Sequence, residues 1–208
     1  MDATSAIQFF ILIILVLLSA FFSSAETSLT TANKIKLKAL ADEGDKRAKT
    51  VLKATEDSGK MLSAILIGNN IVNLSAASLV TTLALNLWGS AAIAFASGTL
   101  TVIILIFGEI TPKTLATIHS DKMARIYAGS ILFLMRILTP AIFIINKLAF
   151  LVLTLLRVDP SAKAPSMTEH ELRTIVDVSH EDGVIESEER QMIYNVFDFG
   201  DSLAKDIM

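Results

Sequence analysis

Three long stretches of almost uninterrupted apolar residues dominate the pattern of hydrophobic and polar positions along this chain. Residues 7–28 contain a single charged side chain, Glu26, and residues 61–88 and 90–108 contain none. A helix needs about 20 predominantly apolar residues to cross the roughly 30 Å hydrocarbon core of a bilayer. The pattern therefore predicts three membrane-spanning helices, at about residues 6–29, 61–88 and 91–117.

A fourth apolar run, residues 131–158, is interrupted by Pro140 and carries basic and polar side chains. Its two halves, of about 15 residues each, are more typical of re-entrant or interfacial helices than of spans. Basic residues flank both ends, Arg125 before the run and Arg157 and Lys163 at and beyond its end, which favours both ends on the cytoplasmic side. The alternative is a fourth span, which would place the following residues outside. We expect a re-entrant or juxtamembrane helical hairpin at about residues 129–158.

The segment between the first two predicted spans sets the orientation. Residues 34–60 carry eight Lys and Arg side chains, and basic loops remain on the cytoplasmic side of a membrane. We therefore expect a multi-pass protein of the cell inner (plasma) membrane with its N-terminus outside. The apolar residues of this segment recur at helical spacing, so we expect an amphipathic helix along the membrane surface, broken near Gly44.

Composition adds a second region to this picture. The chain is 52% hydrophobic, but residues 165–208 hold 3 basic and 11 acidic side chains, against 15 and 10 in residues 1–164. We expect a transmembrane domain over residues 1–160 and a cytoplasmic acidic helical region over residues 161–208. In the latter, Ser166 or Thr168 can cap a first helix, which ends near Gly183, and Ser187 can start a second. The fold class predicted is an all-α integral membrane protein.

Oxygen-bearing side chains interrupt each predicted span, and we expect them to lie at one depth. Hydroxyl, amide, carbonyl and carboxylate oxygens are the ligands that hard cations such as Mg²⁺ and Ca²⁺ take. The chain has no cysteine, which excludes thiolate metal sites. The candidate metal ligands are Ser23, Ser24 and Glu26 on the first span, Asn69, Asn70 and Asn73 on the second, and Gly108 and Glu109 on the third.

Pro112 and Lys113 follow this last pair directly. A proline inside a helix has no N–H to donate, and its ring clashes with the carbonyl four residues earlier. That carbonyl belongs to Gly108, so we expect a helix break at this point and a free carbonyl beside the Glu109 carboxylate. An ionisable residue within a span is a functional-site hypothesis by default.

Each candidate ligand also has a purely structural interpretation. Asparagine and serine side chains in membrane helices often hydrogen-bond neighbouring helices without binding anything else. Glu109 can pair with Lys113 at the favourable i, i+4 spacing, and Glu26 can simply lie at the cytoplasmic interface. The residues alone leave these alternatives open.

The sequence resembles the CorC/CNNM family of magnesium transporters. The resemblance covers nearly the whole chain and rests on four motifs: SAFFSSAET at 19–27, IGNNIVN at 67–73, GEITPK at 108–113 and EDGVI at 181–185. It implies a homodimer with three spans and a juxtamembrane hairpin in each subunit. It also implies Mg²⁺ export coupled to Na⁺ entry, and family members continue into a pair of ATP-binding CBS domains that this sequence does not include.

We therefore expect a transporter rather than an enzyme. Its partners would be a second copy of the chain, the lipid bilayer and the ions Mg²⁺ and Na⁺, and no nucleic acid. Two alternatives from other classes stay open. One is a membrane Mg²⁺ sensor or scaffold without transport, and the other is a transporter of a different divalent cation, Co²⁺ or Ca²⁺.

Overall fold

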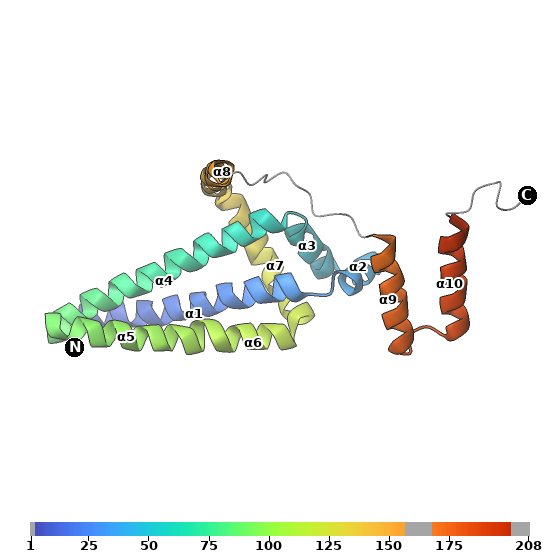
Figure 1. The fold of residues 1–208 in the computed structure, drawn as a ribbon. Coiled ribbons are helices and arrows are strands. Elements are labelled where there is room, and N and C mark those ends of the chain that lie inside the picture. Colours follow the sequence, from blue (N-terminus) through green and yellow to red (C-terminus); the bar gives the residue numbers. More distant parts are fainter. Residues whose placement is uncertain (1–2, 157–167, 201–208) are drawn as a thin grey trace, which may run out of the picture. The chain divides into compact units, whose positions relative to one another are not determined.

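The computed structural model describes residues 3–156 and 168–200, which are helical apart from short turns (Figure 1). No strand occurs in these ranges, so the predicted all-α membrane fold is confirmed. The chain divides into two compact units, Met1–Leu151 and Val152–Met208. The domain boundary predicted at residues 160 and 161 lies outside the described residues. In the first unit the elements are α1 (Ala3–Thr31), α2 (Lys34–Asp42), α3 (Lys46–Thr55), α4 (Ser58–Trp88), η1 (Ser90–Ala92), α5 (Ile93–Ile103), η2 (Ile104–Ile110), α6 (Thr111–Ile118), α7 (Ser120–Ile137) and most of α8 (Thr139–Leu155).

Three helical segments are long and apolar enough to cross a membrane, as the sequence predicts. They are Thr4–Thr31, Ser58–Trp88 and Ser90–Ile118. The third is composite, because η1, α5, η2 and α6 follow one another without a loop. Helix α1 packs against α4 on one side and against η2 and α6 on another (Figure 1). Gly89, at a φ of +79°, ends α4 and lets the chain turn back into the third span.

The basic segment between the first two spans forms two helices, α2 and α3. Asn33 and Asp45 cap the starts of α2 and α3, and Gly44 lies between the helices at a φ of +103°. This confirms the break predicted near Gly44, because glycine adopts that conformation without steric cost. Ion pairs then tie both helices to α7: Lys36 Nζ lies 2.8 Å from Asp121 Oδ2, and Arg125 Nη1 lies 3.0 Å from Asp45 Oδ2.

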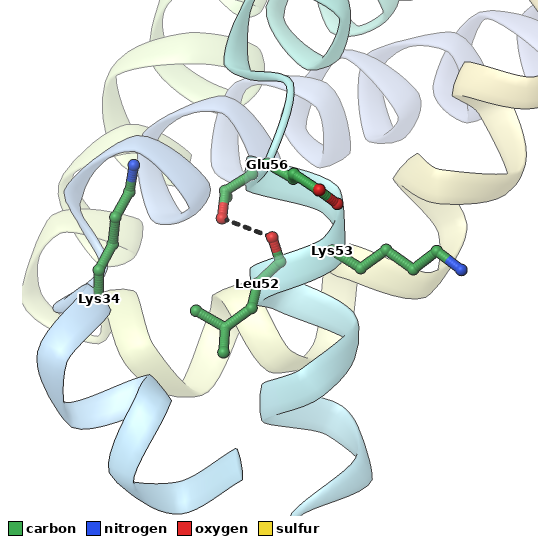
Figure 2. A pocket seen from close by; sticks show the side chains of 5 residues that line it. Lys34, Leu52, Lys53 and Glu56 are labelled. Carbon is green, nitrogen blue, oxygen red and sulfur yellow. Dashed lines mark hydrogen bonds between the residues drawn. The ribbon is translucent and has the colours of Figure 1, made fainter. Parts of the chain in front are cut away.

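An open hollow of about 650 Å³ lies between the start of α2 and the end of α3. In Figure 2 the Lys34 side chain extends across one side of it, whereas Lys53 points away on the other side of the ribbon. The Thr55 hydroxyl donates a hydrogen bond to the Leu52 carbonyl oxygen, at 3.2 Å. None of the predicted metal ligands lines this hollow, so it takes no part in the candidate site.

Small residues bring the first two spans close together. Gly68 of α4 is buried against the Phe22 ring of α1, and Ala25 on α1 and Ala64 on α4 are also buried. A Cβ atom added to Gly68 would lie 2.5 Å from the Phe22 ring, so no other residue fits there without movement. Small residues are the usual means by which membrane helices approach closely.

Helices α7 and α8 correspond to the predicted hairpin, with two differences. The first arm begins at Ser120 instead of about residue 129, and the pair is bent by 74° rather than folded back on itself. The bend falls at Leu138, and Pro140 occupies the first turn of α8, where its missing N–H costs nothing. The Ser63 hydroxyl on α4 donates a hydrogen bond to Asn146 Oδ1 on α8, at 3.3 Å.

The described part of the second unit contains α9 (Glu169–Glu181) and α10 (Ser187–Gly200). Thr168 caps α9 in a reciprocal arrangement with Glu171, whereas the alternative cap, Ser166, lies outside the described residues. Gly183, at a φ of +72°, lies in the turn between the two helices. The helix end and restart predicted from the sequence are therefore both present.

Candidate cation site

Two of the predicted ligands are buried oxygens without a hydrogen-bond partner. Ser23 is 0% exposed, and its Oγ makes no hydrogen bond. The Oδ1 atom of Asn73 is also buried and makes no hydrogen bond. Among the described residues, these are the two buried side-chain polar atoms left unsatisfied. Leaving a buried polar atom unpaired costs about 1–3 kcal/mol, so both atoms have unused capacity to bind a ligand.

Glu109 is a half-buried carboxylate within the third span. It makes no hydrogen bond or ion pair with any residue that the structure describes. The alternative pairing of Glu109 with Lys113 is therefore not formed; Lys113 Nζ lies 3.5 Å from Glu26 Oε2 instead. A carboxylate at membrane depth is costly and normally has a partner, so Glu109 is a third group with unused binding capacity.

Gly108 lies against the first span. A Cβ atom at this position would come within 2.9 Å of Ser19 Oγ. The Ser19 hydroxyl in turn donates a hydrogen bond to Asn69 Oδ1, at 3.5 Å. Ser19 thus joins all three spans at one level, although the sequence reasoning did not select it. The available signal was its position one helical turn before Ser23, on the same face of the helix.

The backbone before Pro112 differs from the predicted helix break. Residues Ile104–Ile110 form a π-helix that continues directly into α6, and the Thr111 N–H donates to the Ile106 carbonyl five residues earlier. The wider turn spares the backbone from the ring clash that Pro112 would cause in a tight helical register. Pro112 itself is buried, and its carbonyl oxygen accepts a hydrogen bond from the Ser24 hydroxyl at 3.4 Å. Ser24 is therefore engaged, unlike Ser23.

The predicted ligands occupy several depths rather than one. Helices α1 and α4 are antiparallel and meet at the Ser19–Asn69 contact. At a rise of 1.5 Å per residue, Ser23 lies about 6 Å from that level toward α2, and Asn73 lies about 6 Å from it in the opposite direction. We call Asn73, Asn69, Ser19 and Ser23 the polar track, and we include Glu109 because it directly follows Gly108, which lies against Ser19. Asn70 is exposed, and the structure does not bring it to the track.

The track is made mostly of neutral oxygens. Nowhere in the described ranges do three His, Cys, Asp or Glu side chains gather as a set of metal ligands. Glu109 contributes one carboxylate, and Glu26 supplies a second near the α2 end of the spans, where it is 42% exposed. An arrangement of hydroxyl, amide and carboxylate oxygens suits a hard cation that keeps part of its water shell.

The sequence is similar to a known family of membrane domains and to several curated proteins. The model of the cyclin M transmembrane N-terminal domain matches residues 10–189. A UPF0053 protein of Haemophilus influenzae is 34% identical over 200 residues, which cover 96% of this chain and 47% of the relative. A UPF0053 inner membrane protein of Escherichia coli is also 34% identical, with 92% and 44% covered.

A polyamine export protein of Salmonella typhimurium is more distant, at 28% identity, with 91% of this chain and 45% of the relative covered. The chain thus spans about half the length of the curated relatives that it matches. The family model covers most of the chain and includes the second and third spans, most of the first span and the polar track. This multi-pass membrane protein therefore belongs to the cyclin M (CNNM) transmembrane-domain family.

Proposed function

We propose that this chain is the membrane domain of a transporter that carries Mg²⁺ out of the cytoplasm. The observation that carries the proposal is the unpaired Glu109 carboxylate inside a span, in a track that also holds the unsatisfied oxygens of Ser23 and Asn73. A cation is the natural partner for such a group, because an isolated charge at membrane depth is costly. The family assignment supports membrane transport in general.

Magnesium fits the chemistry of the track. Mg²⁺ takes oxygen ligands in near-octahedral geometry, usually keeps several waters, and is typically bound through one or two carboxylates. Glu109 supplies charge where the ion is most dehydrated, while Ser23, Asn73 and the Gly108 carbonyl supply neutral oxygens. Because these groups are spread along the track, an ion can exchange ligands stepwise instead of being trapped in one complete shell.

The charge on the connecting segments sets which end of the polar track faces the cytoplasm. The Lys- and Arg-rich α2–α3 region marks the cytoplasmic side, so Mg²⁺ enters past Glu26 and leaves past Asn73. Entry of Na⁺ at overlapping oxygen sites provides the driving force. Two copies of the chain form the working unit. This unit lies in the inner membrane, and the Escherichia coli relative is named an inner membrane protein.

A second candidate cargo is an organic polycation. Two relatives are named polyamine export proteins, at 26% and 28% identity. The contact of 3.5 Å between Lys113 Nζ and Glu26 Oε2 also provides a primary ammonium bound at one end of the track. The same carboxylate could receive the ammonium end of a polyamine.

Flux through the purified protein in liposomes separates these cargoes. Liposomes loaded with a Mg²⁺-sensitive dye should report Mg²⁺ movement that is faster with an opposing Na⁺ gradient, and parallel assays should measure Ca²⁺, Co²⁺ and spermidine. Mg²⁺ flux above that of empty liposomes supports the proposal. Flux of spermidine alone would support the second candidate, and movement of no cation would leave a sensor or scaffold.

A further inference from the structure

The ion pair between Glu26 and Lys113 connects the first and third spans. Glu26 Oε2 on α1 lies 3.5 Å from Lys113 Nζ on α6. It is the one ion pair between two spans in the part of the chain that the structure describes. The two side chains are 42% and 45% exposed, so neither is enclosed by the packing of the helices.

This pair borders the polar track at the α2 end. Glu26 follows Ser23 by three residues, about 4.5 Å along the helix. Lys113 follows Pro112 directly, and the Pro112 carbonyl accepts the hydrogen bond from Ser24. A cation that approaches the unsatisfied Ser23 Oγ from this end therefore passes the carboxylate that Lys113 already occupies.

We propose that Lys113 is a tethered cation that competes with the transported ion for Glu26. This inference rests on the proposed function. When no Mg²⁺ is bound near Glu26, the Lys113 ammonium neutralises the Glu26 carboxylate. An entering Mg²⁺ displaces the ammonium, and the long lysine side chain moves toward the membrane surface. The competition sets the Mg²⁺ concentration at which the track loads, so the transporter stays unloaded when Mg²⁺ is scarce.

The strength of the contact suits an exchangeable competitor. Exposed ion pairs contribute little net stability, so a divalent ion can break this one cheaply. Lysine carries a compact, strongly hydrated charge on a flexible stem, unlike the planar guanidinium of arginine. A pair that only held α1 against α6 would behave in the opposite way, because its removal would loosen the site and weaken Mg²⁺ binding.

The direction in which one substitution changes Mg²⁺ affinity tests the proposal. Isothermal titration of Mg²⁺ into the detergent-purified chain should show Lys113→Met binding at least threefold more tightly than the parent. Lys122→Met is the matched control, because it removes the same charge from an exposed position on α7 where the lysine makes no ion pair with described residues. Weaker or unchanged binding in Lys113→Met, with normal binding in the parent, would overturn the proposal.

A double-mutant comparison separates competition at Glu26 from a general effect of charge. In a Glu26→Gln background, Lys113→Met should change Mg²⁺ affinity less than 1.5-fold, because the contested carboxylate is gone. The same threefold gain with and without Glu26 would refute competition. A parent protein that binds no Mg²⁺ would instead remove the proposed function, a result distinct from a parent that binds Mg²⁺ and variants that do not respond.

Discussion

The polar track in the membrane unit and the α9–α10 pair in the second unit satisfy their polar groups in opposite ways. In the helix pair, Asp177 accepts hydrogen bonds from Arg190 Nε at 2.7 Å and from the Tyr194 hydroxyl at 2.8 Å. Arg173 pairs with Asp198 at 2.8 Å. In the track, Ser23 Oγ, Asn73 Oδ1 and the Glu109 carboxylate have no such partners among the described residues.

This contrast is the reverse of what stability alone would select. A missing partner costs little on a surface exposed to water and several kcal/mol in hydrocarbon. In the exposed helix pair, Arg173 and Arg190 are nevertheless each paired with an aspartate, whereas the buried track has groups without partners. The two Arg–Asp pairs link α9 to α10, and the unpaired groups of the track indicate a place that a mobile ligand completes.

Removing the charge from the track should have the largest effect. We expect Glu109→Gln to keep the fold and to lower Mg²⁺ flux in proteoliposomes below detection, because the amide preserves shape but cannot neutralise a cation. Glu43→Gln is the control, since Glu43 is exposed at the end of α2. Flux at the parent rate in Glu109→Gln would show that the unpaired carboxylate is not part of the transport site.

Separating the spans should disturb the track without touching its oxygens. Gly68→Ala places a Cβ atom 2.5 Å from the Phe22 ring, and overpacking of this kind costs about 1–3 kcal/mol. We expect a lower thermal unfolding temperature in detergent, partly restored by adding Phe22→Leu. Gly98→Ala is the control, because no atom lies within 4 Å of its new Cβ; a similar loss there would contradict the packing argument.

The asparagines should differ according to burial. Asn73→Ala removes an unsatisfied buried oxygen, and we expect about a tenfold loss in Mg²⁺ affinity, roughly 1.4 kcal/mol. Asn70 is exposed, so Asn70→Ala should have a clearly smaller effect in the same titration. Equal effects would mean that the polar track does not define the binding groups of α4.

Removing the Asp177 carboxylate from the α9–α10 pair should change the pKa of Tyr194 and leave transport unchanged. The hydrogen bond to the Asp177 carboxylate raises the pKa of Tyr194, and burial of the hydroxyl raises it to a smaller extent. We expect Asp177→Asn to lower that pKa toward its ordinary value, seen in the absorbance of tyrosinate against pH. Tyr127→Phe should be present in both proteins, because Tyr127 is the other tyrosine of the chain. An unchanged titration curve would mean that the hydrogen bond does not persist in solution.

The same pair gives a pH dependence of definite sign. The Tyr194 hydroxyl, and then Arg190, lower the pKa of Asp177. A carboxyl group whose pKa is depressed in the folded state stabilises the fold above its unfolded pKa of about 3.9, and the contribution disappears as the pH falls through the folded value. Unfolding of α9–α10, followed by circular dichroism, should therefore become easier below about pH 4, and Asp177→Asn should remove this component.

The elements were predictable from sequence because their signals are local. Charge-free runs identify the spans, and Gly44 marks the break between α2 and α3 because it requires a positive φ. The vertical offset between neighbouring spans is not local: it depends on contacts such as Phe22 against Gly68. For that reason the oxygens were expected at one depth and are instead distributed along the track.

The sequence pattern also could not predict which way the asparagine side chains point or that η2 is a π-helix. Asn69, Asn70 and Asn73 are all compatible with a common face by spacing, and only packing shows that Asn70 is the exposed one. The π-helical register of η2 leaves no clear periodic signal over seven residues. Pro112 did indicate that the backbone had to deviate, although the deviation is a widened turn before the proline and not a break.

The widened turn in η2 gives the third span a way to rotate locally. In an α-helix each residue advances the side chain by about 100° around the axis, and a π-helical turn accommodates one extra residue. Were that extra residue to move along the span toward α5, only the residues it passed would turn by about 100°, while the ends of the span stayed where they are. A helix of this kind can redirect a carboxylate such as Glu109 from one neighbour to another without sliding, tilting or unwinding as a whole.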